Sequence, residues 1–178
     1  MTLKHSRIIS TIGIFLLCFL FHFLYDWLPS SVTAIFFPVN ESIWEHMKLI
    51  FSAVTFYGII DYIILQKINI KYNNFVTALF VSALTIIPIY LAMFLPVYYK
   101  IGQNMIITIG IMLVAIIISQ IISYKILKAK DYDKLNVISF ILIIISYIVF
   151  AYLTYYPIKN ELFFDTQEEK YGLNNYNI

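Results

Sequence analysis

Five long apolar runs, separated by short polar segments, dominate the sequence. Each run holds about twenty residues, enough for a helix to cross roughly 30 Å of hydrocarbon at about 1.5 Å per residue. They cover residues 8–28, 43–65, 75–95, 105–127 and 137–156. The runs are continuous rather than alternating, which favours helices over the strands of a membrane barrel. The pattern therefore predicts an all-α integral membrane protein with five transmembrane helices.

The organisation of the chain is simple. No linker rich in proline, glycine or serine, no charge block and no internal repeat divides the 178 residues. We therefore expect a single membrane domain over 1–178, ending in a polar C-terminal tail at 159–178. The first apolar run follows basic residues, as in a signal peptide, but it is too long for one and no small-residue cleavage motif follows it. We expect it to be retained as the first span.

Composition supports this assignment and excludes other classes. The chain is 61% hydrophobic and 12% charged, whereas a soluble domain carries about 25% charged residues, so the lipid bilayer is the expected partner. No basic run with interleaved aromatic residues is present, which argues against nucleic acid as a partner. The single cysteine, Cys18, excludes an intrachain disulfide and a cysteine-based zinc cluster. Nothing in the sequence identifies a protein partner.

The basic residues predict the orientation of the chain. Eight of the twelve fall on one side of the five predicted spans: Lys4, Arg7, Lys67, Lys71, Lys125, Lys128, Lys130 and Lys134. Because basic loops stay on the cytoplasmic side, we expect the N-terminus in the cytoplasm and the C-terminal tail outside the cytoplasmic membrane.

The end of the first run holds a candidate pair of ionisable residues. His22 and Asp26 are four residues apart, on one face of a helix, near the outer end of the predicted span. An ionisable side chain at that depth should face the interior of the bundle or a water-filled cavity. One interpretation has Asp26 orienting the His22 imidazole for metal binding. The alternative is a structural pair that joins the first span to its neighbours.

The segment 38–48 concentrates polar chemistry between two apolar runs. It contains Asn40, Glu41, Glu45, His46 and Lys48. At 100° per residue, one stripe of the second span is polar, which predicts the wall of a polar cavity. The stripe consists of Glu41, Glu45, Lys48, Ser52 and Thr55. The alternative is a stripe packed against polar groups of another span.

Helix capping alone would explain some of the polar residues in this segment, without a binding or catalytic role. Ser42 and Glu45 fit the capping box Ser-x-x-Glu at the start of the second span. A cap leaves His46 and Lys48 unexplained.

In the tail, apolar residues at 162–164 suggest that it folds back onto the outer surface, which would bring Asp165 to the same cavity.

Together these residues predict a polar site on the outer side. His22, Asp26 and His46 are the candidate ligands of a divalent metal, a donor set that suits zinc, manganese or iron. A second set is expected to bind the ligand: Asn40, Glu41, Glu45, Lys48 and Asp165. The HExxH, GxSxG and P-loop motifs are absent, so no reaction follows from the sequence.

Two sequence segments carry a family resemblance. HFLYDW at 22–27 and PVNESIWEHMK at 38–48, with the tail from Phe164 to Gly172, resemble an uncharacterised family of small bacterial integral-membrane proteins. The resemblance covers the whole chain and implies a multi-span bacterial membrane protein, but no activity. A looser similarity, in its His, Asp and Ser residues near a membrane face, is to the seven-span metal hydrolases that include alkaline ceramidases, although this chain has fewer histidines and spans.

Three hypotheses follow, and the sequence leaves enzyme or non-enzyme open. In the first, an outward-facing cavity binds a cation, a metal or a small polar ligand. In the second, the chain is an accessory or structural subunit whose polar groups only cap and pack. In the third, it is a membrane-embedded, metal-dependent hydrolase acting at the outer leaflet, with Glu45 or Glu41 as the general base.

Overall fold

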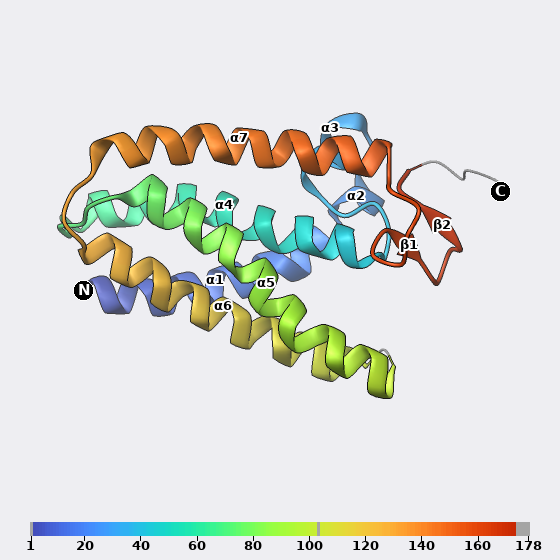
Figure 1. Cartoon of the computed structure of the whole chain (residues 1–178). Coiled ribbons are helices and arrows are strands. Elements are labelled where there is room, and N and C mark those ends of the chain that lie inside the picture. Colours follow the sequence, from blue (N-terminus) through green and yellow to red (C-terminus); the bar gives the residue numbers. More distant parts are fainter. Residues whose placement is uncertain (1, 103, 174–178) are drawn as a thin grey trace.

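The computed structural model describes residues 2–102 and 104–173. Five long helices form an elongated bundle, and a two-stranded antiparallel hairpin lies at the end opposite the start of the first helix (Figure 1). The helices are α1 (Leu3–His22), α4 (Ile43–Lys67), α5 (Phe75–Ile101), α6 (Met105–Lys128) and α7 (Asp133–Tyr155). Between α1 and α4 lie the short helices α2 (Leu24–Trp27) and α3 (Ser31–Phe36), and the hairpin strands are β1 (Phe164–Asp165) and β2 (Lys170–Tyr171).

The five predicted spans are confirmed as helices, but the bounds of the first span need a large correction. The first was predicted at 8–28, but α1 begins at Leu3 and ends at His22. It starts early because Thr2 forms a capping box with His5, and it stops at Phe23, whose N–H donates to Phe21 rather than continuing the helix. The apolar residues that follow belong to α2 and the connection to α3. His22 is therefore a helix end and not a position inside a span.

The third span also runs further than its sequence pattern indicates. It was predicted to end near residue 95, but α5 continues to Ile101 with Pro88 and Pro96 both inside it. Gly102 ends the helix with a positive φ of 78°, a conformation that glycine adopts without strain. Proline is tolerated inside membrane helices because neighbouring groups satisfy the freed carbonyls.

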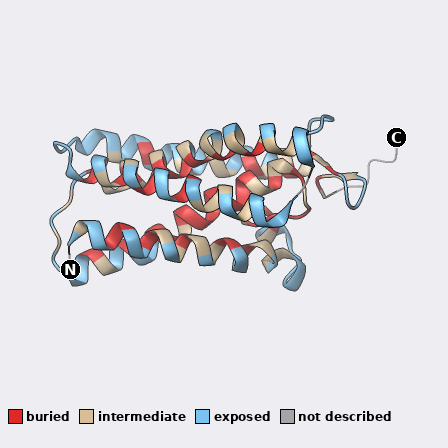
Figure 2. Cartoon of the chain, turned by 90° about the horizontal axis from the view of Figure 1, so that it is seen from below, coloured by how far each residue is buried: buried red, intermediate tan, exposed pale blue. Residues whose placement is uncertain are grey.

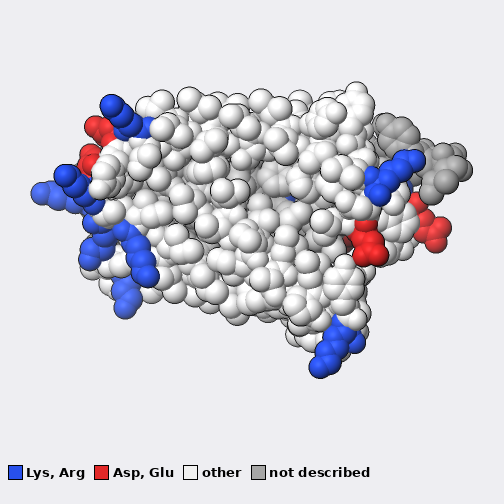
Figure 3. Space-filling model, viewed as in Figure 1, with Lys and Arg blue, Asp and Glu red and all other residues white. Residues whose placement is uncertain are grey.

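The surface of the bundle is that of a membrane protein. Large apolar side chains such as Ile106, Val137 and Ile148 are exposed along the outer faces of the helices, while the buried residues line the inner faces (Figure 2). On the face shown in Figure 3, charged side chains gather at the two ends, and the broad surface between them carries almost none. All five long helices are long and apolar enough to cross a membrane. These features support a multi-pass membrane protein.

Helix α4 is the most buried of the five long helices, and small residues allow close approach between it and its neighbours. It packs against α1 on one side and α5 on the other. Gly13 receives the ring of Tyr57, which lies only 2.0 Å from where a Cβ would be. Gly58 accommodates Leu79 of α5 in the same way. Helices associate in lipid through such close van der Waals contacts, because the hydrophobic effect does not favour helix association inside a bilayer.

A buried ion pair joins α1 to α4 at the end away from the hairpin. The guanidinium of Arg7 contacts the carboxylate of Asp61, and both side chains are almost fully buried. Ser6 and Ser10 donate hydrogen bonds to the same carboxylate at 3.0 and 3.1 Å. The other guanidinium nitrogen donates to Gln120 on α6, at 3.3 Å. The sequence pattern did not predict that Arg7 and Asp61 meet.

We expect Asp61→Asn to destabilise the protein by about 3–5 kcal/mol, because it leaves the Arg7 charge buried without a counter-charge. The matched control is Asp131→Asn, at an exposed position on the same end of the bundle. The free energy of unfolding in detergent micelles measures both. A loss below about 1 kcal/mol for Asp61→Asn would show that the pair does not support the fold.

Candidate functional site

Three side chains from three different segments meet at the hairpin end of the bundle. His22 is the last residue of α1, His46 lies in the first turns of α4, and Glu41 lies in the connection that precedes α4. Ser42 positions the last two, because its hydroxyl accepts from the N–H of Glu45 at 3.3 Å and starts the helix at Ile43. The local sequence thus sets where α4 begins, and the packing of α1 on α4 places His22 beside Glu41 and His46.

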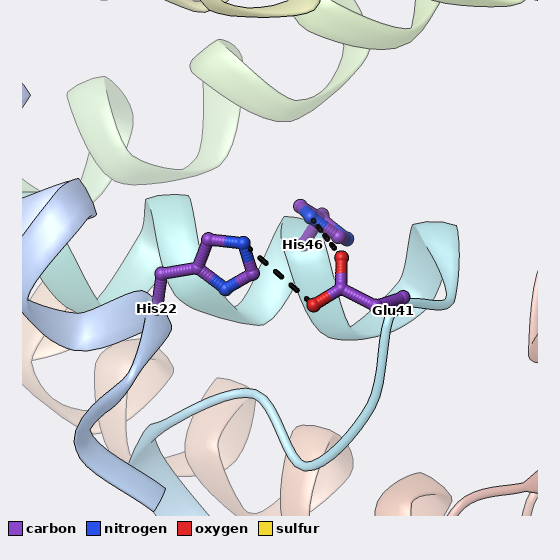
Figure 4. Close-up of side chains that lie close together, drawn as sticks. All are labelled: His22, Glu41 and His46. Atoms are coloured by element: carbon purple, nitrogen blue, oxygen red, sulfur yellow. Dashed lines mark ion pairs between the residues drawn. The ribbon is translucent and has the colours of Figure 1, made fainter. Parts of the chain in front are cut away.

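The carboxylate of Glu41 lies between the two imidazoles (Figure 4). Its oxygens are 3.7 Å from Nε2 of His22 and 3.5 Å from Nε2 of His46. The two rings approach edge to face, with their centroids 5.4 Å apart. One donor atom from each residue lies within 4.8 Å of the others, which is close enough to share one metal ion. Each of the three side chains keeps between a fifth and a third of its surface exposed.

The outer contacts of the two imidazoles differ. Nδ1 of His46 lies 3.0 Å from the carbonyl oxygen of Ser42. That contact requires a proton on Nδ1, so in the neutral ring Nε2 presents its lone pair toward the carboxylate side. Nδ1 of His22 is buried and, among the described residues, has no hydrogen-bond partner. A buried unpaired nitrogen is costly, which makes this ring the least satisfied polar group of the cluster.

A cavity of about 470 Å³ opens next to the cluster. Its polar lining comes from His22, Glu41, His46, Thr108 and Gln167. The rest of its wall is mainly apolar and comes from α1, α4 and α6, with Tyr90 contributed by α5. The volume lies within the range of small-molecule sites in proteins.

Glu45 and Lys48 lie away from this cavity, contrary to the expectation from the sequence. Nζ of Lys48 is 2.6 Å from a Glu45 oxygen, and both side chains are fully buried. Nζ also donates to the carbonyl of Ala34 at 2.8 Å and to the hydroxyl of Thr154 at 2.9 Å. Thr154 in turn donates to Glu45 at 2.7 Å. All donors of the ammonium are therefore used within the protein, and Glu45 is occupied by this pair rather than placed as a base at the cavity.

The predicted polar stripe of α4 follows the alternative interpretation. Ser52, one turn below Lys48, donates to the carbonyl of Phe36 at 2.6 Å. Thr55, a further turn along, contacts the hydroxyl of Tyr147 on α7. The stripe thus packs against α3 and α7 instead of lining water. The capping box is also only half present, because the Glu45 carboxylate turns inward rather than back to the N–H of Ser42.

Asn40 and Asp165 hold the segment before α4 against the hairpin. Asn40 donates to the carbonyl of Gly172 at 3.1 Å. Asp165 is fully buried and accepts from the N–H of Glu41 at 2.9 Å. Its other oxygen accepts from the N–H groups of Gln167 and Glu168. The tail does fold back onto the bundle as expected, but Asp165 acts on the backbone of Glu41 and not on the cavity.

Asp26 does not join the two histidines. It lies on α2, beyond the break at Phe23, and is exposed. Within residues 2–102 and 104–173 it makes no side-chain hydrogen bond or ion pair, so the predicted orientation of His22 by Asp26 is wrong. The spacing of four residues implies proximity only in a continuous helix, and this helix ends at His22. Glu41 contacts the imidazole instead.

Two contributions to the cavity were not predicted. Gln167 reaches it from the turn between β1 and β2, and Tyr90 reaches it from the middle of α5. The resemblance in the tail offered a signal for the hairpin as a whole but not for this side chain. A tyrosine inside an apolar run offered none, because aromatic residues in spans usually only pack.

The comparisons with known proteins assign a family to the chain but no activity. Residues 2–173 match the model of a family described as "Family of unknown function (DUF6512)". The chain belongs to this family. That confirms the resemblance to a family without a known function. No match to the chain is found among curated proteins or among solved structures.

We expect Glu45→Gln to lower the free energy of unfolding by about 3–5 kcal/mol, because it leaves the Lys48 ammonium buried without its counter-charge. Glu41→Gln should change it by less than about 1 kcal/mol, because the Glu41 side chain is partly exposed and contacts only imidazoles. Unfolding in detergent micelles measures both variants. Equal losses would show that the two glutamates do not have the separate roles assigned to them.

Proposed function

We propose that this protein binds a divalent transition metal through His22, Glu41 and His46, in a cavity that faces the outside of the cytoplasmic membrane. The observation that carries the proposal is the meeting of two imidazoles and one carboxylate, from three separate segments, within 4.8 Å of one another. Two histidines and a glutamate form a donor set used by zinc proteins.

The distances support a metal ion of this size. A tetrahedral zinc site with bonds of about 2.0–2.1 Å places neighbouring donor atoms roughly 3.3 Å apart. One Glu41 oxygen lies 3.7 Å from Nε2 of His22 and the other lies 3.5 Å from Nε2 of His46, and one donor atom from each residue lies within 4.8 Å of the others. Side-chain rotations would bring the three donors to the tetrahedral spacing.

A second candidate function is metal-dependent hydrolysis at the outer leaflet. Three protein ligands leave the fourth position of a tetrahedral metal open, which is the pattern of catalytic rather than structural zinc sites. The adjoining cavity of about 470 Å³ supports this candidate. Against it, Glu45 is paired with Lys48 and Glu41 would be a ligand, so neither carboxylate is free as a general base. Metal binding without turnover is therefore the function that the geometry supports best.

Zinc binding tests this proposal directly. We expect the purified protein in detergent to bind one zinc ion per chain, measured by elemental analysis and by titration calorimetry. His22→Ala, His46→Ala and Glu41→Gln should each weaken binding by at least about tenfold, because each removes a ligand. Asp26→Ala is the matched control and should bind zinc as the wild type does. Zinc binding that survives all three ligand substitutions, or no binding at all, would refute the proposal.

The orientation needs its own test, because the cavity must face the outside. We expect Glu168→Cys, in the hairpin turn, to react with a membrane-impermeant maleimide in intact cells, whereas Lys130→Cys should react only after the cells are opened. Both positions are exposed, and the native Cys18 is buried, so the background should be low. Labelling with the reverse pattern would place the cavity on the cytoplasmic side.

A further inference from the structure

The cavity beside the metal site changes from polar to apolar in the same direction along three helices. His22 lies at the hairpin end of α1, and Cys18 and Phe19 line the cavity one turn deeper. His46 and Leu49 repeat this order on α4. Because these helices run in opposite directions, the shared order reflects depth in the membrane and not position in the sequence.

On helix α6 the same order holds from its second turn. Thr108 lines the cavity and Met112 lines it one turn deeper, while Met105, the first residue of the helix, adds an exposed apolar side chain at the hairpin end. Gln167 from the hairpin turn adds an amide at the polar end, where Glu41 also lies. The cavity is thus amphipathic, with polar groups at the depth of lipid headgroups and an apolar wall at the depth of lipid chains.

Some apolar side chains that line the cavity also reach the outer surface of the bundle. Phe19 of α1 is 38% exposed and Met105 of α6 is 73% exposed. Exposed apolar side chains on helices of this length contact lipid chains. A molecule can therefore enter sideways from the membrane without its apolar part passing through water.

The net charge of the metal site at the polar end of the cavity favours an anionic headgroup. A divalent metal held by two neutral imidazoles and the Glu41 carboxylate keeps one uncompensated positive charge and an open coordination position. That arrangement is complementary to one anionic oxygen, and the Gln167 amide can donate a hydrogen bond to a second oxygen. A phosphodiester carries one negative charge and offers both oxygens.

On these grounds we infer that the cavity binds a membrane phospholipid, with a phosphate oxygen on the metal and part of an acyl chain against α1, α4 and α6. This inference rests on the proposed metal site and names the ligand of that site.

The test uses the full chain, purified in detergent, and dioleoyl-phosphatidylglycerol as the probe, with retained lipid counted by native mass spectrometry. We expect the zinc-loaded protein to retain one phospholipid, and the same protein after chelation of zinc to retain it at least tenfold more weakly. Equal retention with and without zinc overturns the inference while leaving zinc binding intact. If no zinc binds, the proposed function and the inference both fail.

A cavity-filling substitution separates the lipid from the metal. Ile109→Trp fills the apolar wall, and we expect it to keep zinc but weaken lipid retention at least tenfold. Val114→Trp, on an exposed face of the same helix, is the matched control and should retain both. Wild-type lipid retention by a zinc-loaded Ile109→Trp variant overturns the inference. The comparison of zinc-loaded and zinc-free wild type decides the question even if the tryptophan variant fails to fold.

Competition distinguishes a lipid from a free phosphate. Lysophosphatidylglycerol, which has one chain, should displace the bound lipid, whereas glycerol 3-phosphate should not do so at the same concentration. Equal displacement by both would show that the site recognises the phosphate alone, and the lipid assignment would be wrong.

Discussion

The buried contact between Lys48 and Glu45 fixes the geometry on which the hairpin end of the bundle depends. Its ammonium donates to the carbonyl of Ala34 in α3 and to the hydroxyl of Thr154 in α7. Its carboxylate accepts from Thr154 and from the N–H of Val39. One pair thus ties two helices and an irregular connection to α4. Because an unpaired charge at this depth is so costly, the connection that carries Glu41 has few alternatives to the observed path.

The hairpin holds the same connection from the other side. Asp165 accepts from the N–H of Glu41, and the N–H of Trp44 donates to the carbonyl of Leu162 at 2.8 Å. The indole of Trp44 stacks on Phe163, with the ring centroids 4.8 Å apart. The backbone of Glu41 is therefore held between a buried ion pair and a folded tail, while its side chain stays free to face the two histidines. The backbone of Glu41 is thus fixed by contacts that do not involve its carboxylate.

The Arg7–Asp61 cluster and the cluster of His22, Glu41 and His46 differ in their surroundings. Around Arg7 and Asp61, serine hydroxyls supply the carboxylate with hydrogen bonds, and the cluster joins α1, α4 and α6. At the hairpin end, His22 and His46 have only Glu41 between them, and one imidazole nitrogen has no partner among the described residues. The Arg7–Asp61 cluster lies inside the bundle and joins its helices, whereas the cluster of His22, Glu41 and His46 borders a cavity of about 470 Å³.

The sequence by itself determined the membrane class, the five helices and the polar character of the hairpin end. These features depend on the length of the apolar runs and on residue type, which are local properties that decide whether a segment is stable in lipid. It also identified both histidines and Glu41. It did not determine which polar residues meet. The break at Phe23 separates Asp26 from His22, and the rotation of α4 turns Glu45 and Lys48 toward Thr154 while His46 faces the cavity. Those outcomes depend on contacts between segments as far apart as α4 and α7, so only the tertiary structure decided them.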